Sequence, residues 1–309
     1  MNNSNNSGNK RDLIYIMSPS YSGSTLLTYL LATHPEISTI GELKATSMGD
    51  IDSYSCSCGS LLKECQFWSH LQESMQEQNA PLDFHQFGTN FKSESKLCNK
   101  LLHSSVRGRL FEFSRKSAFS LMSDCMKKRS DILDKIEKMI AAVCELQGGR
   151  VFLDGSKDPV RLQFLNQSGL WNVKVINLIR DGRGVTNSFM RHYEVGMNIA
   201  AKEWLHSINE IRKMETYLLP EQLMSVVYED LCQEPDAVLT DIFEFIGIDK
   251  SLVNTDFRNT SHHILGNSMR LGSTSEIRLD EKWKQSLGME ALDVFASIAG
   301  DSNKQLGYE

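Results

Sequence analysis

Short apolar runs that alternate with helical segments constrain this chain more than any other feature. Residues 13–17 form an uninterrupted apolar run, which is typical of a strand buried on both faces of a sheet. Residues 18–23 have the composition of a turn, and residues 24–33 then place leucines on one face of a helix. The apolar runs at residues 151–153 and 173–179 are again followed by helical patterns. This alternation predicts an α/β fold, a three-layer sandwich with a central parallel sheet.

One long stretch does not follow the alternation. Residues 50–149 are polar, carry a group of cysteines near their start, and end in a strongly amphipathic helical pattern. We expect them to form a mostly helical insertion within one domain of residues 12–309, because α/β enzymes of this length often have one domain. Residues 1–11 are rich in Asn, Ser and Gly and lack the apolar core of a signal peptide, so we expect a disordered leader.

The charge balance and the cysteine count limit the partners and the compartment. The chain has 33 Lys and Arg against 39 Asp and Glu, which argues against a nucleic-acid partner but leaves room for a local basic pocket. It has no apolar run of about 18 residues, so we expect no membrane span. An odd cysteine count, 7, without an export signal predicts a cytoplasmic protein with free thiols. Nothing in the pattern specifies the oligomeric state.

The serine-rich loop at residues 18–25 joins the first predicted strand to the first predicted helix. Backbone N–H groups at the start of a helix bind anions, and Gly23 permits a close approach of the backbone to a ligand. The hydroxyl groups of Ser22, Ser24 and Thr25 can add hydrogen bonds. The alternative is a Ser/Gly turn that only caps the helix. The loop is not a Walker A motif, because Ser24 stands where that motif has its lysine.

A second candidate anion site follows the predicted strand at residues 173–179. Arg180 begins the sequence RDGR, and Ser188 lies two helical turns further along the chain. One guanidinium and one hydroxyl group can together hold a phosphate. Taken alone, RDGR would more simply be a charged surface turn.

In this order, the two motifs resemble the two signature loops of the sulfotransferases that use phosphoadenosine phosphosulfate (PAPS). "SYSGSTLL" resembles the loop that holds the 5′-phosphosulfate, and "LIRDGRGVTNS" resembles the loop whose arginine and serine hold the 3′-phosphate. The resemblance therefore implies that Arg180 and Ser188 bind the 3′-phosphate, in a sheet of the P-loop nucleotide-binding type. The implied contacts to the 5′-phosphosulfate are Tyr21, Ser22, Gly23, Ser24 and Thr25.

Two further stretches support the resemblance. "GSKDP" resembles the stretch that supplies a lysine, here Lys157, in the tyrosylprotein branch of the family. "VYEDL", followed by a proline and "FIGI", resembles a stretch whose tyrosine, here Tyr228, lies near the nucleotide. The match covers residues 13–42 and 151 to about 252. "CSCG" and "CQFW" resemble a mainly bacterial subgroup of these enzymes.

The resemblance implies transfer of a sulfuryl group from PAPS to a hydroxyl group of an acceptor, with adenosine 3′,5′-bisphosphate as the second product. It carries the role of general base to Glu42, at the end of "HPEISTIGE". The alternatives are that Glu42 is a solvated surface residue or a helix-capping partner. His34 is a rival base, although its place before a proline at a helix end is typical of a capping residue.

Tyr21 departs from the family pattern, because many members carry Lys or Arg at this position to act on the leaving oxygen. The resemblance implies that Lys157 takes this role as a point charge, the alternative being an ordinary surface lysine in a turn. Residues 254–279 have little periodicity and are expected to form a long loop, called the late loop. Asn267 and Arg270 of this loop are expected contacts to PAPS, because similar enzymes close such a loop over it. The alternative is that this loop is a mobile surface segment.

Cys56, Cys58 and Cys65 form the pattern C-x-C-x₆-C. Zinc normally takes four ligands, and His70 could be the fourth, although nothing in the sequence specifies it. Buried thiols around Trp68 and a local disulfide are the alternatives, so we assign no metal from the sequence.

Two other functions stay open at this point. A P-loop kinase that uses ATP is disfavoured by the missing Walker lysine. A degenerate nucleotide binder without catalysis is favoured by Tyr21 and disfavoured by the presence of Glu42, Lys157 and the 3′-phosphate motif. The acceptor class, whether small molecule, carbohydrate or protein, is not specified by any motif.

Overall fold

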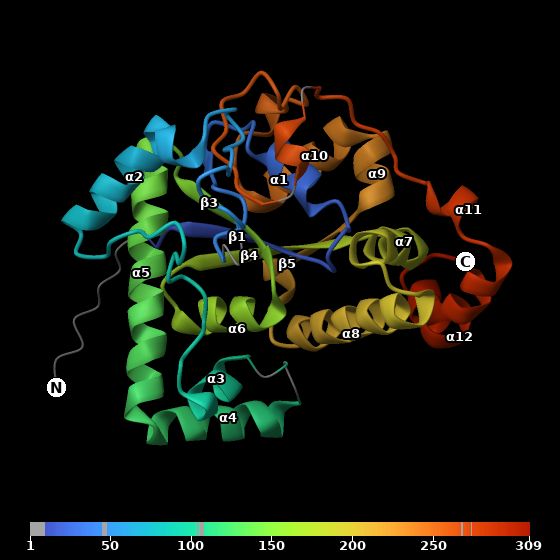
Figure 1. The fold of residues 1–309 in the computed structure, drawn as a ribbon, viewed down its shortest axis with the longest axis horizontal. Helices are drawn as coiled ribbons and strands as arrows, with labels where there is room; N and C mark the ends of the chain where they lie inside the picture. Colours follow the sequence, from blue (N-terminus) through green and yellow to red (C-terminus); the bar gives the residue numbers. More distant parts are fainter. Residues whose placement is uncertain (1–9, 45–47, 104, 106–107, 267, 273) are drawn as a thin grey trace.

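The computed structural model describes residues 10–44, 48–103, 105, 108–266, 268–272 and 274–309. Its centre is a five-stranded sheet in the order β2-β3-β1-β4-β5, in which all neighbouring strands are parallel (Figure 1). The strands are β1 (Asp12–Met17), β2 (Ile37–Ser38), β3 (Val151–Lys157), β4 (Asn172–Ile179) and β5 (Leu223–Val227). The predicted α/β fold with a central parallel sheet is confirmed.

Helices cover both faces of this sheet (Figure 1). One side carries α1 (Ser24–Leu31), α9 (Tyr228–Gln233) and α10 (Pro235–Ile246), and the other carries α6 (Pro159–Ser168) and α8 (Met197–Glu215). Alternate side chains of β1 pack into the cores on opposite faces of the sheet. Leu13, Tyr15 and Met17 pack into a core with α6 and α8, whereas Ile14 and Ile16 pack into a second core with α1 and α10. Both faces of β1 are buried, which explains why its sequence is continuously apolar.

The expected helical stretch lies between β2 and β3. Its elements are the 3₁₀ turn η1 (Leu62–Glu64), α2 (Gln66–Glu77), α3 (Lys96–His103), α4 (Arg109–Leu121) and α5 (Ser123–Gln147). α5 buries Ile136, Met139 and Ile140 in the same core as α6. It ends at Gly148, whose φ of 80° is the left-handed conformation that glycine adopts at helix ends. Figure 1 shows α5 standing across one end of the sheet.

The remaining elements are mostly helical and follow β4 in the chain. They are α7 (Gly182–Tyr193), η2 (Pro220–Gln222), η3 (Lys250–Leu252), η4 (Ser268–Leu271), α11 (Trp283–Ser286) and α12 (Met289–Gln305). α7, α8 and α12 share a small third core that includes Val185, Trp204 and Phe295. Among the described residues, no helix has both the length and the apolar character needed to cross a membrane.

The strand order brings the loops that carry the candidate site residues to one edge of the sheet. Met17 at the end of β1 is in register with Lys157 at the end of β3 and with Asn177 near the end of β4. Ile179 of β4 is in register with Val227 of β5. The loops that follow β1, β3, β4 and β5 therefore begin at the same edge, which is where parallel sheets of this kind bind their ligands.

Candidate functional site

The loop after β1 is built around two buried serines and a glycine. Ser18 and Ser22 are 5% and 0% exposed, and within the described part of the chain their hydroxyl groups have no hydrogen-bond partner. Gly23 precedes α1 with a φ of 92°, and no side chain of a described residue caps this helix. Buried hydroxyl groups are normally paired, so two unpaired ones beside an uncapped helix start leave this loop able to bind a polar ligand.

Gly23 is required here because the Tyr228 ring leaves no room for a side chain. A Cβ atom at this position would lie 2.4 Å from Cδ2 of the Tyr228 ring, closer than such atoms approach. The absence of a side chain lets the loop after β1 pack directly on Tyr228, the first residue of α9. Burial raises the pKa of Tyr228 to about 12, so its hydroxyl group stays protonated at neutral pH.

Arg180, at the end of β4, connects the second predicted anion loop to the first. Its guanidinium donates one hydrogen bond to the carbonyl oxygen of Tyr21 at 2.8 Å and lies 4.3 Å from the centre of the Tyr228 ring. It also donates a hydrogen bond to the carbonyl oxygen of Asp280 at 2.8 Å, with the Asp280 carboxylate 3.5 Å away. Arg180 is 7% exposed, so these contacts hold its charge in place.

Ser188 faces the same space from the second turn of α7. Its hydroxyl group donates to the carbonyl oxygen of Gly184 at 3.1 Å, a bond within the helix that an external acceptor can replace. The side chain of Tyr21 packs against Phe189 and His192 of the same helix. Burial and a hydrogen bond to Tyr193 raise the pKa of Tyr21, so it carries no charge at neutral pH.

Glu42 and Lys157 form an ion pair at the edge of the sheet. Glu42 lies shortly after β2 and Lys157 ends β3, and the two side chains are 30% and 17% exposed. Lys157 has a φ of 67°, as does Tyr21, and such left-handed backbone is uncommon for residues other than glycine. Strained backbone of this kind persists where the surroundings impose it, often at functional sites.

A cavity of about 520 Å³ collects most of the predicted site residues. Both candidate anion loops and the ion pair contribute to its wall: Tyr21, Gly23, Ser24, Thr25, Glu42, Lys157, Arg180 and Ser188. Ser22 lies buried in the loop, and Tyr228 contacts Gly23 and Arg180 from behind. The sequence analysis missed Asp280, which lines the cavity and touches Arg180. No local signal marks Asp280, because it lies 100 residues from its partner.

A second cavity, of about 400 Å³, adjoins the first. Ser20, Glu42 and Lys157 line both, so the ion pair stands between them. The wall of the second cavity also includes Lys44, His103, Asp158, His206 and Glu210, which the sequence analysis did not single out. These residues come from four separate segments of the chain, so no single motif contains them.

Charge in the second cavity is organised around Lys44 and Asp158. Their side chains form a salt bridge of 2.7 Å, and Asp158 also accepts hydrogen bonds from the N–H groups of Val160 and Arg161 at the start of α6. Burial alone would raise the pKa of Asp158, but the Lys44 ammonium and these N–H groups together hold it below its usual value. Burial and the same ammonium lower the pKa of His103.

Three further candidate residues from the sequence analysis are His34, Asn267 and Arg270. His34, the rival base, lines neither of these two cavities. It is 1% exposed, accepts a hydrogen bond from the N–H group of Glu36 at 3.2 Å and packs against Phe243. Asn267 lies outside the described residues, as does the side chain of Arg270. Gly266 and Met269, their neighbours in the late loop, do line the larger cavity.

The three cysteines come together with a histidine that the sequence analysis did not consider. Cys56, Cys58 and Cys65 form a group with His263 of the late loop, and the exposed His70 does not belong to this group. His263 is 198 residues from Cys65 in the sequence, so spacing could not identify it.

Comparison with known proteins gives a consistent result. A model described as the sulfotransferase family matches residues 14–251. The chain is similar to a sulfotransferase domain from the curacin biosynthetic pathway, at 21% identity and a TM-score of 0.51, over 97% of this chain and 98% of that one. It also resembles a sulfotransferase domain from the Synechococcus PCC 7002 olefin synthase, at 20% identity and a TM-score of 0.48, over 93% and 94% of the two chains. No curated protein matched the sequence.

Proposed function

Because the chain belongs to the sulfotransferase family, we propose that it transfers a sulfuryl group from PAPS to a hydroxyl group of an acceptor. The observation that carries this proposal is the cavity of about 520 Å³, in which two anion-binding loops and the Glu42–Lys157 pair share one wall. A donor with a phosphate at one end and a phosphosulfate at the other needs two separate anion sites. The acceptor hydroxyl group, which is the nucleophile, needs a base beside the site that holds the phosphosulfate.

The loop after β1 has the donors that a 5′-phosphosulfate requires. The first turn of α1 presents backbone N–H groups, and no side chain of a described residue competes for them. The unpaired buried hydroxyl groups of Ser18 and Ser22 lie in the same loop. Ser24 and Thr25 stand at the cavity wall and can add further hydrogen bonds.

Arg180 and Ser188 are the proposed ligands of the 3′-phosphate. The guanidinium already lies at the cavity wall, held by the carbonyl oxygens of Tyr21 and Asp280. A phosphate dianion would compete with the Asp280 carboxylate, which is 35% exposed and can turn toward solvent. Ser188 would exchange its bond to Gly184 for a phosphate oxygen.

Glu42 and Lys157 are the proposed catalytic residues. The acceptor oxygen forms a bond to sulfur as the bond between sulfur and the bridging phosphate oxygen breaks. The hydroxyl proton passes to the Glu42 carboxylate, and the electron pair of the broken bond stays on the 5′-phosphate of adenosine 3′,5′-bisphosphate. Lys157 stabilises the charge that develops on the bridging oxygen, a role that preorganised donors fulfil in many transferases.

The second cavity is the proposed acceptor site. It meets the nucleotide cavity at Glu42 and Lys157, so an acceptor bound there would present its hydroxyl group to both residues. Its wall carries both signs of charge, from Lys44 on one hand and Asp158 and Glu210 on the other, together with the imidazole of His103. A polar acceptor fits this wall better than an apolar one.

Calorimetric titration with adenosine 3′,5′-bisphosphate and with ATP tests the proposal. We expect saturable binding of the bisphosphate, weaker binding of ATP, and a marked loss of bisphosphate affinity in Arg180→Lys and Ser188→Ala. Arg183→Ala is the matched control, because Arg183 pairs with Asp181 and does not line the cavity. Absent binding of the bisphosphate, or equal binding by wild type and Arg180→Lys, would overturn the assignment.

A further inference from the structure

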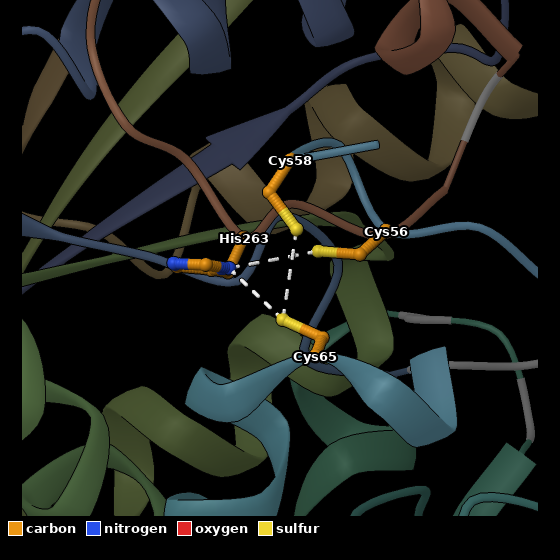
Figure 2. A group of neighbouring side chains, drawn as sticks. All are labelled: Cys56, Cys58, Cys65 and His263. Atoms are coloured by element: carbon orange, nitrogen blue, oxygen red, sulfur yellow. Dashed lines mark hydrogen bonds between the residues drawn. The ribbon is translucent and has the colours of Figure 1, made fainter. Parts of the chain in front are cut away.

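Three thiols and one imidazole converge where the insertion meets the late loop (Figure 2). The Sγ atoms of Cys56, Cys58 and Cys65 and a ring nitrogen of His263 all lie within 4.8 Å of one another. His263 Nδ1 is 3.3 Å from Cys65 Sγ and 3.7 Å from Cys56 Sγ, and the sulfur atoms of Cys58 and Cys65 are 3.6 Å apart. Figure 2 shows the four side chains pointing toward a common centre.

These distances are those of a tetrahedral metal site. Zinc binds thiolate sulfur at about 2.3 Å and histidine nitrogen at about 2.0–2.1 Å, which places the ligand atoms about 3.5–3.8 Å apart in a tetrahedron. Three of the six separations between the four atoms, 3.3, 3.6 and 3.7 Å, are close to that range, and the others are at most 4.8 Å. Four ligands of type Cys₃His complete the coordination shell, which is the arrangement of structural rather than catalytic zinc sites.

We propose that Cys56, Cys58, Cys65 and His263 bind one structural zinc ion that fastens the late loop to the insertion. Three sulfur ligands and one imidazole favour zinc over magnesium or calcium, which prefer oxygen. A disulfide between Cys58 and Cys65 explains the group less well. Their sulfur atoms are 3.6 Å apart, against about 2.05 Å in a disulfide, and the bond would leave Cys56 and His263 without a role.

Backbone geometry around the cysteines supports metal binding. The N–H group of Cys58 is hydrogen-bonded to the sulfur of Cys56, and that of Ser60 to the sulfur of Cys58. Cys65 directly precedes α2, and its sulfur accepts from the N–H groups of Phe67 and Trp68. Backbone N–H groups aimed at the sulfur atoms orient them before a metal binds, as the contacts around metal ligands do.

His263 is held in place by contacts from the cysteine segment. Its ring stacks on Phe67 with a centroid separation of 4.4 Å and an interplanar angle of 7°. On either side of it, the Ser57 hydroxyl group donates to the carbonyl oxygen of His262 and accepts from the N–H group of Ile264, both at 2.8 Å. These contacts fix the orientation of the His263 ring before any metal binds. Metal-ligating histidines are generally oriented by such surrounding contacts.

The zinc would stabilise the segment of the late loop that contacts the chain just before Glu42, in the wall of the larger cavity. Two residues beyond His263, the N–H group of Leu265 donates to the carbonyl oxygen of Ile40 at 2.9 Å, directly before Gly41 and Glu42. The N–H group of Gly266 donates to the Tyr54 hydroxyl group at 3.1 Å. The metal would thus join the cysteine segment to the strip of chain that carries Glu42.

Metal content tests the proposal independently of any enzymatic activity. The full chain, purified without chelators from medium containing zinc, is analysed by inductively coupled plasma mass spectrometry. We expect about one zinc per chain in the wild type. We expect the zinc to be lost in Cys58→Ser and His263→Asn, and retained in the matched controls Cys232→Ser and His70→Asn. Cys58 is exposed, so its substitution leaves the core packing intact.

A second measurement decides the matter if a variant fails to fold. Apo wild type titrated with cobalt(II) is expected to develop the absorption bands of tetrahedral thiolate coordination, and zinc should then displace them. Chelator should lower the Tm of the wild type and leave that of Cys58→Ser unchanged.

The proposal is overturned if wild type contains no zinc and gives no thiolate–cobalt bands, if Cys58→Ser retains the wild-type zinc content, or if Cys58 and Cys65 form a disulfide in the purified protein. A failed proposal here would leave the proposed sulfuryl transfer untouched, because nucleotide binding is measured separately.

Discussion

The ammonium group of Lys157 is paired with the carboxylate of Glu42 at the boundary between two cavities. The two residues are 115 positions apart in the sequence and lie at the ends of adjacent segments, since β2 and β3 are neighbours in the sheet. Each neutralises the charge of the other. A donor in the larger cavity would attract Lys157 toward its bridging oxygen and free Glu42 to accept a proton.

Replacing Lys157 by alanine should lower kcat while leaving nucleotide affinity nearly unchanged. Loss of one donor to a developing negative charge typically lowers kcat about 10²- to 10³-fold. The readout is conversion of PAPS to adenosine 3′,5′-bisphosphate with a panel of phenolic, alkyl and sugar alcohols, alongside calorimetry of the bisphosphate. Lys250→Ala is the control, because Lys250 is exposed and lines neither cavity. Near-normal turnover in Lys157→Ala would remove this residue from the mechanism.

Glu42→Gln keeps the shape of the side chain and removes its basicity. A general base contributes about 10²- to 10⁴-fold, so turnover in the same assay should fall by that factor. Bisphosphate binding should persist in calorimetry, because the two anion loops are intact. Glu244→Gln on the exposed face of α10 is the matched control. Equal loss of turnover and of bisphosphate binding would indicate a structural role for Glu42 instead.

Gly23→Ala should destabilise the protein and weaken nucleotide binding. The new Cβ would combine a left-handed φ of 92° with a 2.4 Å approach to the Tyr228 ring. Gly148→Ala separates the two effects, because Gly148 has a φ of 80° and no atom within 4 Å of the added Cβ. We expect the control to lose about 1–2 kcal/mol of unfolding free energy, from the left-handed conformation alone. Gly23→Ala should lose more, by urea denaturation, and only this variant should lose bisphosphate affinity.

The Lys44–Asp158 pair should make stability depend on pH in the acid range. The pKa of Asp158 is depressed in the folded state, so its ionised form stabilises the protein above the carboxyl pKa of the unfolded chain, about 3.9. That contribution is lost as pH falls through the depressed pKa. Urea denaturation should therefore show a large difference between wild type and Asp158→Asn at pH 7 and a small one near pH 2. A difference that stays constant across this range would show that ionisation of Asp158 does not contribute to stability.

Asp280→Asn should increase the affinity for adenosine 3′,5′-bisphosphate. The carboxylate lies 3.5 Å from the Arg180 guanidinium, where it repels a phosphate bound to the same arginine. The backbone contact between Arg180 and Asp280 does not depend on the side chain and should persist in the variant. We expect a gain of about three- to tenfold at low ionic strength, falling as salt is added. Weaker binding in calorimetry would mean that Asp280 positions Arg180 rather than competes with the ligand.

The sheet and the positions of the two candidate anion loops could be predicted because their signals are local. A strand buried on both faces must be continuously apolar, as residues 13–17 are, and the loop that follows it must begin at the edge of the sheet. The same holds for β4 and Arg180. The predicted parallel sheet and the family are confirmed, while the roles of the individual residues stay predictions.

The relationships between distant segments were decided only by the tertiary structure. Periodicity describes how a residue relates to its own strand or helix, and it carries no information about which segments become neighbours. The order β2-β3-β1-β4-β5 brings Glu42 to Lys157, and the return of the late loop across the sheet edge brings His263 to the cysteines. The sequence by itself determined the buried strands and the polar loops at their ends. Packing of these strands and loops in space selected the partners of Glu42 and Arg180, and with them the shape of the cavity.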